Sequence, residues 1–484
     1  MPPENESFIP HMEITPPRLT IAALAAAAAL AILFHLMGST LLRIPFVALA
    51  AALAATATIL AHLRPQRPNR FAYLLLVPLV PALLAQVFFA SEPARAAGIV
   101  ATLLSLSLFI HQIALPEPNI KEMPAVWMPD FFLQSLFPFP ALLGWIRHLP
   151  AKRGWGPTAI GALLAAPLAI VLLALFASAD GAFRDAIADV FTWEGIRSLF
   201  WDGFLLIFLL AGGWALLHRK PAMPNDPAVV QADPSTASAA WGALGVVNAA
   251  FLSFIGFQFS RLFGGAAYRA ANDLVFAEYA RSGFFQLLLV AGIALVFALG
   301  LHRIARSDKG TRGGTLLLLA QTAIVLVSAA QRLSLYIETY GPSVARYWAG
   351  AGILTVAVAI GIMAFMSIRR LPAALAINAL TLLALSALAI VPTTDIEGRV
   401  ANGVVDRRLA NGKSDLPMIA FELSSDAVPA LLRLPLDTQI YANDDAMNIA
   451  DGLRRQKSKL PSDWREASSA DRRAARLLKD LPNE

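Results

Sequence analysis

Long runs of apolar residues, separated by short polar segments, fill the first four-fifths of the chain. A helix needs about twenty apolar residues to cross a hydrocarbon core of roughly 30 Å. Eleven runs approach that length, so we predict eleven membrane spans, at about residues 19–36, 44–63, 71–90, 98–115, 157–176, 199–217, 241–259, 283–301, 315–330, 349–368 and 371–391. Segment 131–149 is also apolar, but Pro138, Pro140 and flanking bases favour an interfacial or half-inserted segment.

Two polar stretches divide the chain. Residues 220–239 hold Pro, Asp and Ser without an apolar period, which indicates a flexible linker. It separates a first bundle (19–217, about six spans) from a second bundle (240–391, about five spans). The tail, 392–484, is polar with helical spacing and predicts about four short helices. The predicted fold class is an all-α, polytopic transmembrane helix bundle with a small helical tail.

Lysine and arginine residues favour one side of the predicted spans. Segments on the side of the N-terminus hold sixteen basic residues, and those on the other side hold nine. Because basic residues collect in cytoplasmic loops, we predict that segment 1–18 and the linker are cytoplasmic. An odd number of spans then places the tail on the extracytoplasmic face. The net charge of +6 is therefore a topology signal rather than a nucleic-acid footprint.

The composition agrees with a membrane protein and argues against several kinds of catalytic or metal site. Of the 484 residues, 57% are hydrophobic and 15% are charged, whereas soluble domains carry about 25% charged residues. The absence of cysteine excludes disulfides and thiolate nucleophiles. The seven histidines are isolated, and there is no Walker loop or GxSxG elbow. We therefore predict no metal and no cofactor, and assign no catalytic residue.

Polar residues gather at the predicted extracytoplasmic ends of the spans. A charge costs about 2.5–3.5 kcal/mol at a helix centre, so charges kept near spans need partners or a function. The candidate polar cluster consists of Asp202, Gln258, Arg261, Glu278, Tyr279, Arg281, Gln331, Arg332, Tyr336 and Glu338.

Two explanations of this cluster stay open. Interfacial Arg, Glu and Tyr residues snorkel and form pairs for purely structural reasons. Alternatively, the side chains converge on a functional pocket. If the four charges pair to neutralise one another near lipid, we expect Arg281 to pair with Glu338 and Arg332 with Glu278. The acidic segment 178–195 faces the same side, and a solvated helix explains its carboxylates four residues apart.

Four stretches resemble a known family: "AEYARSGFFQLL" (277–288), "QRLSLYIETYG" (331–341), "FASADGAF" (176–183) and "LSSDAVPAL" (423–431). They are similar to bacterial polytopic membrane proteins described as domain of unknown function 4173, which has a relative numbered 4153. The resemblance covers roughly 176–431. It implies a multi-pass protein of the bacterial inner membrane and lends no activity or catalytic residues.

These observations support three hypotheses about function. The leading one is a non-enzymatic envelope role, as a transporter-like or signalling component that binds an anionic or amphipathic ligand at its extracytoplasmic face. The alternative is a membrane enzyme that modifies a lipid or glycan at the outer leaflet, with Glu278, Glu338 or Asp202 as general acid or base. The third is a scaffold whose tail recruits an envelope protein. Expected partners are membrane lipids and a small-molecule or lipid ligand, with no nucleic acid.

Overall fold

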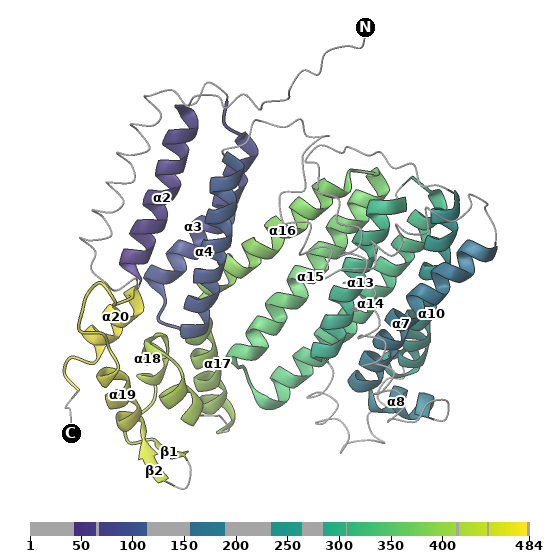
Figure 1. Ribbon diagram of the computed structural model, residues 1–484. Helices are drawn as coiled ribbons and strands as arrows, with labels where there is room; N and C mark the ends of the chain where they lie inside the picture. Colours follow the sequence, from purple (N-terminus) through teal and green to yellow (C-terminus); the bar gives the residue numbers. More distant parts are fainter. Residues whose placement is uncertain are drawn as a thin grey trace.

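The computed structural model describes residues 43–63, 67–113, 155–188, 234–263, 284–305, 307–412, 416–442 and 445–481 (Figure 1). Nine helical segments in this part of the chain are long and apolar enough to cross a membrane. They are α2 (Ile44–His62), η1 with α3 (Arg70–Leu75 and Leu76–Phe88), α4 (Glu92–Ile113), α7 (Trp155–Ala179), α10 (Pro234–Phe263), α13 (Phe284–Ala305), α14 (Lys309–Tyr340), α15 (Val344–Arg369) and α16 (Ala373–Ile390).

Each of these nine segments coincides with one predicted span. The predicted spans at 19–36 and 199–217, and segment 131–149, lie outside the described residues. Helices α7, α10, α14 and α15 run past the predicted apolar windows at both ends. Helix α14 has 32 residues, because the Asp308 carboxylate caps its start by accepting the N–H of Thr311 (2.7 Å) and Gly341, at φ 83°, ends it.

Helix α10 begins at Pro234, inside the segment expected to be a linker. Residues 235–240 are buried, so the last part of 220–239 is packed helix rather than flexible chain. The rest of that segment lies outside the described residues. The packing follows from small side chains: a Cβ added to Gly242 would overlap the backbone of Thr158, and one added to Gly161 would overlap that of Ala239. Helices α7 and α10 therefore approach at backbone distance.

The helices group by contact rather than by order along the chain (Figure 1). Helices α7, α10, α13, α14 and α15 share one large apolar core. Helices α2, α3 and α4 share smaller clusters, to which α16 contributes Leu385 and Ala389. Position along the chain had assigned α7 to the first bundle and α16 to the second. In the structure α7 packs along α10, and α16 packs on α3 and α4.

The tail folds around a core of its own at one end of the helices (Figure 1). Its elements are η4 (Val391–Thr394), α17 (Ile396–Asn411), η5 (Met418–Glu422), η6 (Ser425–Ala427), α18 (Val428–Leu431), β1 (Gln439–Ala442), β2 (Asp445–Asn448), α19 (Ile449–Ser458) and α20 (Ser469–Leu477). Four α-helices agree with the sequence pattern. The antiparallel hairpin of β1 and β2 was not predicted, so the described chain is mostly rather than entirely helical.

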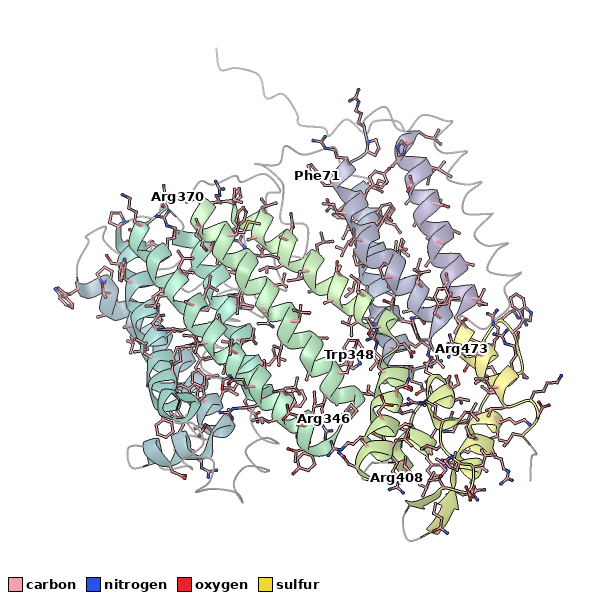
Figure 2. All side chains as sticks on the ribbon, turned by 180° about the vertical axis from the view of Figure 1, so that it is seen from behind. Phe71, Arg346, Trp348, Arg370, Arg408 and Arg473 are labelled. Atoms are coloured by element: carbon pink, nitrogen blue, oxygen red, sulfur yellow. The ribbon has the colours of Figure 1, made fainter. Side chains whose placement is uncertain are left out.

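The tail is joined to the bundle by continuous packing. Its core includes Tyr347 and Trp348 at the start of α15, and the Tyr347 hydroxyl donates to Thr394 (3.0 Å). Figure 2 shows Trp348 where α15 approaches the tail. We call the ends of the membrane helices that lie nearest to the tail their tail-side ends.

Candidate functional site at the tail-side ends of the helices

The structure describes only part of the predicted polar cluster. Asp202, Glu278, Tyr279 and Arg281 lie outside the described residues, as do the side chains of Gln258 and Arg261 on α10. The other four residues follow one another along the tail-side end of α14 and are Gln331, Arg332, Tyr336 and Glu338.

Arg332 is buried in an ion pair with Asp180, at the junction of α7 and α8 (Gly181–Ala188). Its Nη2 lies 3.0 Å from Asp180 Oδ2, and its Nη1 donates to the Ala179 carbonyl (2.6 Å). The side chains are 2% and 0% exposed, so the two opposite charges compensate each other away from water. The other Asp180 oxygen accepts the N–H of Phe183 at the start of α8 (3.1 Å).

This pairing gives Arg332 a partner that the sequence analysis did not predict. Sequence reasoning favoured Glu278, which lies outside the described residues, so that pairing stays a prediction. It placed segment 178–195 on the extracytoplasmic side and assigned Asp180 no partner. The family resemblance did mark both residues, because Asp180 belongs to "FASADGAF" and Arg332 to "QRLSLYIETYG". The ion pair thus joins two of the four stretches that resemble a known family.

Aromatic rings next to Asp180 in the sequence form a dry cluster against α10. The Phe176 ring stacks on Phe254 with 4.0 Å between centroids and meets Phe251 edge to face at 5.3 Å. Phe183 packs edge to face on Phe254 as well, at 5.3 Å. This apolar packing on either side of Asp180 favours a structural ion pair over a catalytic carboxylate.

The last turn of α14 is held by arginines from two other elements. Arg346 lies over the Tyr336 ring, 4.0 Å from its centroid, and Figure 2 shows Arg346 at the tail-side end of α15. Arg407 on α17 donates to the carbonyls of Glu338 (3.0 Å) and Thr339 (2.7 Å), which the helix end leaves without intrahelical partners. The Glu338 side chain is exposed, and its pairing with Arg281 stays a prediction.

The second polar site was not predicted and involves the fourth stretch, "LSSDAVPAL". The buried Asp426 Oδ2 accepts the backbone N–H groups of Ala90 (2.8 Å) and Ser91 (3.1 Å), which directly precede α4. A tail residue therefore caps a membrane-spanning helix from more than 330 positions away along the chain. Ser424 Oγ donates to the same carboxylate oxygen (3.1 Å).

Four more contacts surround this cap. Arg43, directly before α2, donates to the Phe89 carbonyl (2.9 Å) and lies 3.7 Å from Asp471 on α20. The Asp471 carboxylate accepts the Ser425 hydroxyl (2.6 Å). Glu397 accepts the N–H of Ser424 (2.6 Å). We call Arg43, Glu397, Ser424, Ser425, Asp426 and Asp471 together the tail clamp.

The environment of Asp426 changes its acidity. Burial raises the pKa of this carboxyl from 3.8 to about 6, and the nearby carboxylates of Asp395 and Glu397 act in the same direction. The hydrogen bonds from Ala90 and Ser424 oppose that increase. Asp426 therefore titrates close to neutral pH while it holds the start of α4.

A cavity of about 340 Å³ lies beside the tail clamp, close to the lower end of the ~300–1,000 Å³ typical of small-molecule sites. The polarity of its lining residues depends on the element that supplies them. The residues from α3, the α3–α4 loop, α16 and η4 are mainly apolar and comprise Pro81, Leu84, Phe88, Phe89, Ile390 and Thr393. The remaining three, Asp395, Asp426 and Arg473, are charged. Figure 2 shows Arg473 beside the tail-side ends of the N-terminal helices.

The described residues include no group of three His, Cys, Asp or Glu side chains that could hold a metal ion. A family described as domain of unknown function (DUF4153) matches residues 19–434. Sequence reasoning named 4173 first and 4153 as its relative, so the primary assignment changes, and the match also extends over the N-terminal half. No curated protein and no solved structure matches the chain.

The Arg332–Asp180 pair is testable by a double-mutant cycle on the full chain. Asp180→Asn and Arg332→Gln should each destabilise the protein by about 3–5 kcal/mol, because each removes one charge of a buried ion pair. The double variant should lose less than the sum, with a coupling of about 0.5–3 kcal/mol in thermal or denaturant unfolding. The exposed Arg184–Asp185 pair is the control and should show almost no coupling. Additive losses at Arg332 and Asp180 would contradict the pairing.

The Asp426 cap predicts a pH dependence of tail docking. Since the docked pKa of about 6 exceeds the usual 3.8, the docked tail binds the proton more tightly than a free tail. The contribution of Asp426 to docking is then fully present below about pH 4 and is lost as pH rises through about 6.

Docking should therefore weaken by about 1–3 kcal/mol between pH 4 and pH 7.5 through this group. Limited proteolysis of the tail at each pH measures this weakening as a fall in the protection factor. Asp426→Asn should flatten the profile, whereas Asp437→Asn, at an exposed site on the tail, should keep it. An unchanged profile in Asp426→Asn would show that other groups control docking.

Proposed function

The chain belongs to the family of domain of unknown function 4153, and we propose that it binds an amphipathic ligand where its tail meets the membrane helices. The cavity beside the tail clamp carries this proposal. One part of its wall comes from membrane-spanning elements and is apolar, and the other comes from the tail and is charged. A molecule with a hydrocarbon part and a polar part matches both walls.

Ligand binding at this place affects the docking of the tail. The cavity shares Asp426 and Phe89 with the clamp contacts, so an occupant touches the groups that join the tail to α4. A ligand that binds the docked arrangement more tightly shifts the equilibrium towards it. We therefore favour a signalling component, in which the tail reports occupancy to an envelope partner.

A transporter-like role has weaker support. Transport needs polar groups that continue through the membrane, and the cavity lies at the tail-side ends only. Deep polar groups do exist: Gln321 and Asn248 are buried in α14 and α10, and the Gln321 amide has no hydrogen-bond partner among the described residues. No described cavity connects them to the tail clamp.

The enzyme alternative gains one specific observation. Asp395 and Asp426 both line the cavity, and a carboxyl with a pKa of about 6 suits general acid–base catalysis near neutral pH. These two replace Glu338 as the candidate acid or base, because the Glu338 side chain is exposed and does not line the cavity. An enzyme would convert the bound amphiphile, and a sensor would release it unchanged.

The orientation rests on the distribution of basic residues. In Figure 2, Phe71 and Arg370 lie at the end away from the tail, and this end also carries Arg70, Arg303 and Arg369. Positive residues collect on the cytoplasmic side. We therefore place the tail on the extracytoplasmic face of a bacterial inner membrane, with the N-terminus in the cytoplasm.

A reporter enzyme that is active only outside the cytoplasm tests this orientation. Fused after Glu484 it should be active, and inserted between Asn225 and Asp226 it should be silent. The reverse pattern would invert the topology and place the cavity on the cytoplasmic side.

Ligand binding is testable with a cavity-filling substitution. Leu84→Trp should occupy the cavity and reduce the amount of amphiphile retained by the purified full-length chain, measured by native mass spectrometry. Leu103→Trp is the matched control, because Leu103 is equally lipid-facing on α4 and does not line the cavity. In the same samples the ligand should slow proteolysis of the tail. Equal retention in both variants, with the same tail protection, would contradict binding at this site.

A further inference from the structure

An exposed apolar stripe on α3 and η1 leads into the cavity. Leu74, Val77, Leu84 and Phe88 are 48%, 51%, 45% and 47% exposed and share one helical face with the cavity residue Pro81. Leu84 and Phe88 line the cavity, so the stripe and the cavity form one continuous surface. A molecule dissolved in the membrane therefore reaches the cavity along α3 without leaving the hydrocarbon region.

The length of this stripe suits one leaflet. From Val77 to Phe88 the α-helix rises by about 16 Å, close to half of a hydrocarbon core of roughly 30 Å. Phe88 lies at the tail-side end of α3 and Val77 lies towards the middle of the span. An acyl chain from the tail-side leaflet thus fits along the stripe, with its headgroup at the level of the tail.

At that level, one cation and two carboxylates keep free hydrogen-bonding capacity. Arg473 lines the cavity and forms no hydrogen bond or ion pair with the described residues. Asp395 uses Oδ1 to cap α17 through the N–H of Gly398 (3.2 Å), and Asp426 uses Oδ2 for the clamp. The second oxygen of each carboxylate has no hydrogen bond to described residues.

We infer that the ligand is a membrane phospholipid whose headgroup joins a phosphate to a primary ammonium. This inference rests on the proposed amphiphile binding and specifies its chemistry. The Arg473 guanidinium donates to the phosphate oxygens, for which its planar fork is suited. The ammonium donates to the free oxygens of Asp395 and Asp426, and the acyl chain lies on the α3 stripe.

The charges of the cavity separate this headgroup from others. A purely anionic headgroup satisfies Arg473 but brings negative charge towards two carboxylates without offering them a cation. A quaternary ammonium carries the positive charge but has no N–H to donate to the carboxylate oxygens. Only a headgroup with both a phosphate and a donating ammonium serves all three side chains.

The test uses the full-length chain in detergent and three phospholipids with identical acyl chains. Their headgroups are phosphoethanolamine, phosphocholine and phosphoglycerol, and native mass spectrometry measures the bound fraction of each in direct competition. The phosphoethanolamine lipid should be retained about tenfold better than either competitor. Soluble phosphoethanolamine, which lacks the acyl chain, should not compete.

Two variants assign the headgroup contacts. Arg473→Gln should lower retention of all three lipids about tenfold, because each carries a phosphate. Asp395→Asn keeps an amide oxygen able to cap α17, and should lower the preference for the ammonium headgroup over phosphocholine. Arg476→Gln, an exposed arginine one turn further along α20 that does not line the cavity, is the control for loss of positive charge.

Each result has one meaning. If the unmodified chain retains none of the lipids and Leu84→Trp changes nothing, the proposed function itself is wrong. If it retains all three equally, or if Arg473→Gln and Arg476→Gln behave alike, amphiphile binding stands and the headgroup assignment is overturned. If soluble phosphoethanolamine competes as well as the lipid does, the ligand is not drawn from the membrane.

Discussion

The carboxylate of Asp426 satisfies backbone N–H groups that the start of α4 leaves open, and the boundary between tail and bundle depends on this contact. A helix entering a membrane begins with amide groups that have no intrahelical acceptor, and lipid offers them none. Here the acceptor is on the tail, so the start of α4 and the tail are ordered together. Arg43 donates to the Phe89 carbonyl of the same loop and forms an ion pair with Asp471. Donors and acceptors of the loop backbone are therefore both hydrogen-bonded.

The same constraint acts where α14 meets the tail. The tail-side end of α14 has carbonyls without intrahelical partners, and the Arg407 guanidinium of the tail donates to two of them. About two turns before them, Arg332 is neutralised by Asp180 between α7 and α8. Tail residues thus complete two membrane helices, α4 and α14, which belong to different packing groups. The tail is therefore positioned to respond to changes in either group.

The cavity follows from this arrangement. Where the clamp draws the tail against α3 and α16, the apolar flank of the helices and the charged edge of the tail meet, and the space between them is amphipathic. The carboxyl that holds the clamp also lines the cavity, and its pKa of about 6 reflects the burial that docking imposes. Proton binding and tail docking are therefore linked through Asp426, and the proposed signalling role rests on this linkage.

The sequence by itself determined the elements that depend on local pattern. The nine described spans coincide with apolar runs, and α17 ends at Asn411 before Gly412 (φ 66°), where glycine adopts the left-handed conformation at little cost. It also marked the right stretches, because Arg332, Asp180 and Asp426 all lie in quoted segments. Only the tertiary structure decided their partners. Arg332 meets a residue 152 positions away and Asp426 one 336 positions away. A sequence holds several carboxylates able to neutralise the same arginine, and packing of the helices selects among them.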